Sequence, residues 1–112
     1  MDDFKCSNTE TFNCTVFIAG DIDVAKQFCR EYFYNTGWCC TIEPTTYIYT
    51  GGEEEGIRIG FINYARFPID SKQLQLERVT KFSEQLAKKL CQKSLSIVTT
   101  DKTYYIELME KK

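Results

Sequence analysis

The stretch YIYTGGEEEGIRIGFINYARFP, residues 47–68, decides how this chain folds. It joins two segments that favour strands. Trp38–Thr50 is rich in β-branched and aromatic residues, and Ile57–Ala65 alternates in its apolar side chains. The residues GGEEEG between them have the length of a hairpin loop. A phosphate-binding loop would instead place its glycines between a strand and a helix. The sequence therefore predicts an antiparallel hairpin with a glycine-rich, acidic tip.

On the N-terminal side of this hairpin, the sequence predicts an arm, a strand and a helix. Residues 1–10 are polar and without periodicity, which is typical of a flexible arm. Apolar side chains alternate over Thr11–Ala19, which predicts a strand. Asp21 can accept hydrogen bonds from the first turn of the helix that follows, and Gly37 supplies the left-handed residue that ends it.

On the C-terminal side, Asp70 and Gln73 form a pair like a capping box before a second helix with an apolar stripe. Two short strands follow, Leu95–Thr100 and Thr103–Leu108. The order is β-α-β-β-α-β-β within a single domain, residues 11–112. We therefore expect an α+β two-layer sandwich, ferredoxin-like (β-α-β-β-α-β) with an extra C-terminal strand.

Charge and composition exclude several classes of partner. The chain has 14 Lys and Arg against 16 Asp and Glu, a net charge of −2, so no general affinity for nucleic acid is expected. The N-terminus lacks the basic and apolar regions of a signal peptide, and no apolar run is long enough to span a membrane. We therefore expect a cytoplasmic protein whose six cysteines are free thiols rather than disulfides.

The composition also argues against catalysis. The chain has no histidine, which removes the commonest general base and metal ligand. The acidic pair Asp21 and Asp23 lies at a helix start, where the helix dipole accounts for it without chemistry. We expect a protein that is not an enzyme, with no catalytic residues, no metal and no cofactor.

The second strand of the hairpin and its exit, IRIGFINYARFP, offer side chains suited to a ligand. Arginines donate planar, two-pronged hydrogen bonds, tyrosines stack on flat rings, and an asparagine both donates and accepts. If the strand register places them on one face, they form a platform for a small anionic ligand. The same residue types are enriched in protein interfaces, so a subunit interface or a face without a partner are the alternatives. The candidate ligand-binding residues are Arg58, Arg66, Tyr47, Tyr49, Asn63 and Tyr64.

The acids of the hairpin, Glu53, Glu54 and Glu55, allow two interpretations. Acids at a hairpin tip are most simply solvated charge. They are also candidates for contact with a basic surface of another protein. Three contiguous carboxylates in one loop do not converge on a metal ion, which needs oxygen ligands from elsewhere in the fold.

Several runs of this sequence resemble a small family of uncharacterised proteins carried by phages and prophages. The resemblance covers residues 12–108, and its most specific elements are Tyr49–Gly52, Ile62–Tyr64 followed by Arg66–Pro68, and Thr100–Thr103. No catalytic residue is carried over from it. The resemblance implies a phage accessory protein that acts against host defence in the cytoplasm of the bacterial cell.

Two functions follow as hypotheses. The first is an oligomeric sponge that sequesters a nucleotide immune signal, with Arg58, Arg66 and the tyrosines lining the site. The alternative is an inhibitor of a host defence protein that acts through the acidic tip and the aromatic surface. We expect a homo-oligomer, because two helices cannot cover an aromatic-rich sheet with an extra strand.

Overall fold

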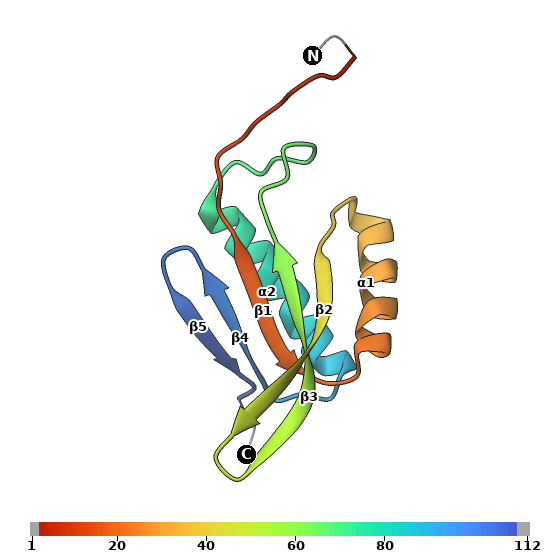
Figure 1. The fold of residues 1–112 in the computed structure, drawn as a ribbon, viewed down its shortest axis with the longest axis vertical. Helices are drawn as coiled ribbons and strands as arrows, with labels where there is room; N and C mark the ends of the chain where they lie inside the picture. The colour runs from red at the N-terminus through yellow and green to blue at the C-terminus, as the bar shows by residue number, and fades with distance from the viewer. Residues whose placement is uncertain (1–2, 110–112) are drawn as a thin grey trace.

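A five-stranded antiparallel sheet with two helices against one face makes up the computed structural model, which describes residues 3–109 (Figure 1). The strand order is β2-β3-β1-β4-β5. The predicted α+β two-layer sandwich and its order of elements are confirmed, and the ferredoxin-like topology stays a prediction. The elements are β1 (Cys14–Ala19), α1 (Ile22–Thr36), β2 (Thr41–Tyr49), β3 (Gly52–Phe61), α2 (Lys72–Lys89), β4 (Ser94–Thr99) and β5 (Thr103–Glu107).

Local signals set both ends of α1 as the sequence predicts. The Asp21 carboxylate accepts hydrogen bonds from the backbone N–H groups of Asp23 at 2.7 Å and Val24 at 3.2 Å. Gly37 has φ 68°, and its N–H donates to the carbonyl of Phe33 at 3.0 Å. A side chain at Gly37 would be strained in this left-handed conformation, so glycine ends the helix there.

The predicted start of α2 is wrong by one residue. The cap is Ser71, whose extended backbone precedes Lys72 and whose hydroxyl accepts from the backbone N–H of Leu74 at 3.1 Å. Asp70 lies outside the helix, because the capping side chain belongs to the last residue before the first helical one.

The hairpin is longer than predicted, because β3 begins at Gly52 rather than at Ile57. The turn comprises only Thr50 and Gly51, the latter at φ 86°. Glu53–Glu55 pair with Thr46–Ile48 in the strand ladder. The predicted GGEEEG loop is therefore wrong. The strands pair as far as the two-residue turn, because each further pair adds backbone hydrogen bonds. Glutamates are tolerated in this part of the strand because solvent reaches both of its faces.

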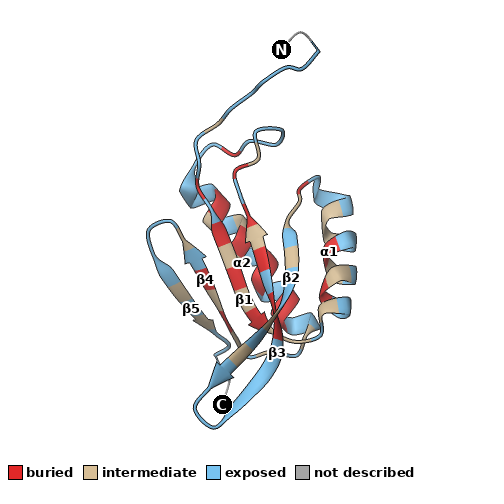
Figure 2. Ribbon diagram, in the orientation of Figure 1, coloured by how far each residue is buried: buried red, intermediate tan, exposed pale blue. Residues whose placement is uncertain are grey.

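The core lies between the sheet and the helices. Residues that alternate along β1 and β3 are buried, whereas the end of β3 near the turn is exposed (Figure 2). Phe82 of α2 is fully buried, and its ring centroid lies between 5.2 and 5.6 Å from those of four aromatic residues of α1 and β3. Those residues are Phe28, Tyr32, Phe33 and Phe61. This aromatic cluster joins both helices to the same face of the sheet.

Candidate ligand-binding site

The opposite face of the sheet is covered by neither helix, and we call it the open face. Along each strand, alternate side chains point to it, and strand pairing places one such residue from each strand in a single row. Across β2, β3, β1, β4 and β5 the row reads Glu43, Arg58, Phe17, Ser96 and Tyr105. Because Tyr105 is 66% exposed, the row presents charged and aromatic groups to solvent.

Arg58 stands at the centre of the charged half of this row. Its Nε lies 3.6 Å from a carboxylate oxygen of Glu43, and its guanidinium carbon lies 5.6 Å from the Phe17 ring centroid. The two charged side chains are 52% and 62% exposed, and an exposed ion pair contributes about 0–1 kcal/mol. Arg58 can therefore exchange Glu43 for the carboxylate of a ligand at little cost.

Tyr47 forms a wall on the same face. Its hydroxyl donates to the carbonyl of Ile57 at 2.8 Å, and its ring lies across Gly56. A Cβ at Gly56 would collide with this ring and approach the carbonyl oxygen of Ile18 to 2.8 Å. Burial raises the pKa of Tyr47, so its phenol stays protonated. Glycine at position 56 is thus what lets the tyrosine cross the strand.

A recess of about 190 Å³ lies beside Tyr47 on this face, and we call it the open-face recess. It is bounded by β1, the β2–β3 hairpin, β4 and β5. Sites for drug-sized molecules occupy roughly 300–1,000 Å³, so one chain encloses only part of such a ligand. The side chains that matter for recognition are Phe17, Tyr47, Glu54, Ser96 and Tyr105.

The predicted ligand-binding residues divide into two groups. Tyr47, Tyr49 and Arg58 lie on β2 and β3 at positions that face the open side. Asn63, Tyr64 and Arg66 follow the end of β3, in the segment 62–70 that we call the exit loop. The exit loop and the hairpin turn lie at opposite ends of β3 (Figure 1). The single platform that the sequence suggested is therefore not formed.

Asn63 is a structural residue in this fold. It is 8% exposed, and its amide donates to the Thr9 hydroxyl at 3.2 Å and to the Glu10 carbonyl at 2.8 Å. Its side-chain oxygen accepts from the backbone N–H of Ile69 at 2.9 Å. The amide thereby ties residues 9–10 to the exit loop.

Two predictions concern the segment before β1. The flexibility of the arm stays a prediction. The strand itself begins at Cys14 rather than at Thr11.

The other two exit-loop candidates contact their own neighbours. The Arg66 guanidinium lies 5.3 Å from the Phe67 ring centroid. Burial, together with the Cys39 thiol beside it, raises the pKa of Tyr64 to about 12. Neither contact directs these side chains toward the open face.

The glutamates of β3 do not form a contiguous acidic finger, because successive strand residues face opposite sides. Glu54 lines the open-face recess with Tyr47. Glu55 faces the other side and accepts from the Thr46 hydroxyl at 3.1 Å. Sequence reasoning thus placed Glu54 in a possible protein contact, whereas the structure brings it beside the candidate ligand site.

The six cysteines form no disulfide within residues 3–109. Burial raises the pKa of Cys14 to about 11, which keeps it a neutral core residue. A hydrogen bond with Cys29 raises the pKa of Cys40, and the same bond lowers that of Cys29. In the described part of the chain, no group of three potential ligands could hold a metal ion. Neither helix in these residues has the length and apolar character needed to cross a membrane.

Three residues of the site escaped sequence reasoning: Phe17, Ser96 and Tyr105. They come from three strands and meet only through the pairings of β1 with β4 and of β4 with β5. The alternation of β1 indicates that Phe17 faces away from the core, but no local pattern indicates which residues lie beside it.

Comparison with known proteins finds the same fold in a phage enzyme. No family model matches the chain, and no curated protein matches it. A phage SAM lyase in complex with S-methyl-5'-thioadenosine superposes with a TM-score of 0.78 at 13% identity, covering 96% of this chain and 98% of that one. A phage SAM lyase in the apo state gives a TM-score of 0.66 at 15% identity, covering 90% and 92%.

This comparison overturns the prediction that the chain is not an enzyme. That prediction rested on the absence of histidine, but the fold shared over nearly the whole length of both chains is that of a lyase. The absence of histidine was therefore too weak a ground for that prediction. By its similarity, the chain has the fold of the phage SAM lyases.

Proposed function

We propose that this protein is a lyase that cleaves S-adenosylmethionine, with the substrate bound on the open face of the sheet. The observation that carries the proposal is the match in fold to a phage SAM lyase over nearly the full length of both chains. Because the similarity extends over both chains from end to end, this chain has counterparts of the strands on which a lyase of this fold can form its site.

The chemistry of S-adenosylmethionine explains how such a lyase works without histidine. The sulfonium is already an activated leaving group. When a carboxylate oxygen of the substrate attacks its own Cγ, the Cγ–S bond breaks and its electron pair returns to sulfur. The products are S-methyl-5'-thioadenosine and a lactone of the amino-acid portion, and no proton has to move. General acid–base catalysis by a side chain is not required.

The open-face recess supplies groups that suit this substrate. The rings of Phe17, Tyr47 and Tyr105 offer surfaces for adenine. The Glu54 carboxylate complements the positive charge of the substrate, and Arg58 lies close enough to Tyr47 to influence its pKa. Because the reaction consumes one positive and one negative charge, a partly apolar recess that displaces water favours it over bulk solvent.

The size of the recess supports the predicted self-association. About 190 Å³ encloses part of S-adenosylmethionine but not all of it. A second copy lying on the uncovered face would complete the enclosure and exclude water. Self-association stays a prediction, and sedimentation at micromolar concentration measures it directly.

Sequestration of a nucleotide-like ligand without cleavage is the second candidate. The aromatic rings and the Glu54 carboxylate of the recess favour it, because they suit the binding of a positively charged nucleoside without any further group. Both candidates use the same side chains and differ only in whether the ligand is broken.

Incubation of the purified protein with S-adenosylmethionine, followed by mass spectrometry, tests the proposal. We expect S-methyl-5'-thioadenosine to accumulate with repeated turnover. Retention of intact S-adenosylmethionine without product would overturn the lyase and leave sequestration. Failure of both binding and cleavage would overturn both candidates.

Matched variants locate the site. Glu54→Gln removes the negative charge that complements the positively charged substrate, and a contact with a charged group is worth about 1.5–3 kcal/mol, so this variant is expected to lower kcat/KM about tenfold to hundredfold. Glu53→Gln, on the adjacent residue, is the control and should change it little. Arg58→Ala and Arg66→Ala form a second pair, in which only the first variant should weaken the reaction.

A further inference from the structure

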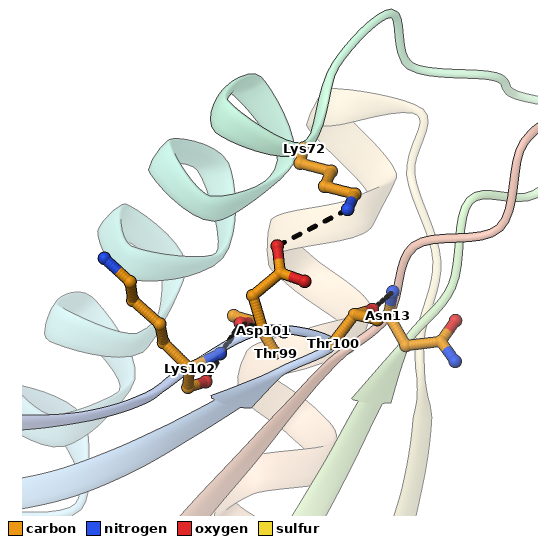
Figure 3. Close-up of polar contacts among 6 residues, drawn as sticks. All are labelled: Asn13, Lys72, Thr99, Thr100, Asp101 and Lys102. Atoms are coloured by element: carbon orange, nitrogen blue, oxygen red, sulfur yellow. Dashed lines mark hydrogen bonds and ion pairs between the residues drawn. The ribbon is translucent and has the colours of Figure 1, made fainter.

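A second recess lies at the other end of β1 and β4, beside the N-terminus of α2, and we call it the α2 recess. Its volume is about 200 Å³. The start of α2, the residues that lead into β1 and the β4–β5 turn surround it, as Figure 3 illustrates for its polar residues. The open-face recess involves the opposite ends of the same two strands, so the two sites are separate.

Two opposite charges face each other across the α2 recess. Lys72 Nζ lies 3.4 Å from a carboxylate oxygen of Asp101, and both side chains are more than half exposed (Figure 3). The β4–β5 turn fixes Asp101, because the Thr99 hydroxyl accepts from the backbone N–H groups of Asp101 at 3.2 Å and Lys102 at 2.9 Å. An exposed ion pair is weak, so a ligand that carries both charges can replace each partner with one of its own.

Gln75 is an independent indication that the α2 recess binds a ligand. The residue is 2% exposed and lines the recess, and within residues 3–109 its side-chain amide takes part in no side-chain hydrogen bond; unlike Ser83 Oγ, which is fully enclosed without a partner, the amide is reached from the recess. Buried side-chain amides normally have hydrogen-bond partners. An amide without one, at the edge of an open recess, is available to a polar ligand.

The helix itself adds attraction for a carboxylate. α2 begins at Lys72 and runs for 18 residues, with no acidic residue in its first turn. The first backbone N–H groups of a helix have no partner within it, and the dipole favours negative charge there. The far wall is apolar, since Phe12 is buried and Leu76 and Tyr104 also line the recess.

We propose that the α2 recess binds a small α-amino acid with an apolar side chain. The ligand carboxylate binds Lys72 and the backbone N–H groups at the start of α2, and the ligand ammonium binds Asp101. The apolar side chain of the ligand packs on Leu76 and Tyr104. The zwitterion thus offers Lys72 a negative charge and Asp101 a positive charge, in place of the charges that the two residues supply to each other in the ion pair. A recess of about 200 Å³ lies below the roughly 300–1,000 Å³ of sites for drug-sized molecules, and a single amino acid is a ligand of that smaller size. The proposal does not depend on the lyase activity.

Isothermal titration with L-methionine and two analogues tests this charge pattern. The analogues are 3-(methylthio)propylamine, which lacks the carboxylate, and 4-(methylthio)butanoate, which lacks the ammonium. We expect L-methionine to bind and each analogue to bind about tenfold more weakly, as expected for loss of one charge-assisted contact. Equal binding of L-methionine and the butanoate, or of inorganic phosphate, would reduce the site to an anion site and overturn the proposal. Absence of any binding at millimolar concentration would overturn it as well.

Variants assign each charge. Asp101→Asn is expected to weaken L-methionine about tenfold and to leave the butanoate unchanged, whereas Lys72→Gln should weaken both. Lys81→Gln, on an exposed residue later in α2, is the matched control. Gln75→Leu should weaken L-methionine with little change in melting temperature, because its amide has no partner to lose. If Lys81→Gln weakened binding as much as Lys72→Gln, the assignment would be wrong.

Discussion

The two ends of β3 carry similar residues and use them differently. At the hairpin end, Tyr47 and Arg58 stand on a face that no described helix covers, and their polar atoms remain close to solvent. At the other end, Asn63 is buried and its amide is fully engaged with residues 9–10 and Ile69. Residue type alone therefore does not separate a ligand site from a structural contact. The two are separated by how many segments, distant in the sequence, meet at the residue.

Asn63→Ala is expected to have the largest effect on stability. It leaves the buried Ile69 N–H without its partner, which costs about 1–3 kcal/mol. It also removes the hydrogen bonds to Thr9 and Glu10, each of which contributes about 0.5–1.5 kcal/mol. We expect a loss of about 2–4 kcal/mol in urea denaturation with an unchanged m-value. Asn13→Ala is the control, because Asn13 is exposed. Equal effects of the two variants would remove the contrast between the ends of β3.

Gly56→Ala tests whether the hairpin end also depends on one close approach. The added Cβ would collide with the Tyr47 ring and the Ile18 carbonyl, and overpacking of this kind costs about 1–3 kcal/mol. Gly52→Ala is the matched control, since its Cβ would lie 3.2 Å from the exposed Tyr49 ring, which can move. Thermal unfolding of both proteins should rank Gly56→Ala as the less stable. The opposite ranking would show that Tyr47 is not confined by the strand.

The pH dependence of stability should reveal the environment of Tyr64. Its pKa is raised to about 12 by burial, whereas a tyrosine in the unfolded chain ionises near pH 10. Between these values the unfolded state binds fewer protons, so stability is fully present below about pH 10 and falls as pH rises toward 12. Tyr64→Phe should reduce this alkaline loss, as measured by denaturation from pH 9 to about 12. Tyr49→Phe, at an exposed position, should not.

Glu43→Gln is expected to have the smallest effect. It removes the exposed ion pair with Arg58, which contributes about 0–1 kcal/mol. Stability should change by less than that amount, while Arg58 becomes free for a ligand carboxylate. Affinity for S-adenosylmethionine should therefore stay the same or increase. A marked loss of stability would show that the pair belongs to the structure rather than to the site.

Features set by neighbouring residues were predictable from the sequence. The cap at Asp21, the left-handed end at Gly37 and the turn between the last two strands all depend on contacts within a few positions. The apolar periods of the strands and helices gave the order of elements and the two-layer class for the same reason. The start of β3 was missed, because nothing local distinguishes three glutamates in a loop from three in a paired strand.

The candidate site depended on pairing across the sheet. Phe17, Ser96 and Tyr105 come together because β1 pairs with β4 and β4 with β5. Likewise, Asn63 was read as a ligand group since its partners at Thr9 and Glu10 lie more than fifty positions earlier. The sequence by itself determined which segments are helices and strands, because backbone preference and capping act over one or two turns. Only the tertiary structure decided which side chains share a face, because register is fixed by burial of the whole sheet against two helices.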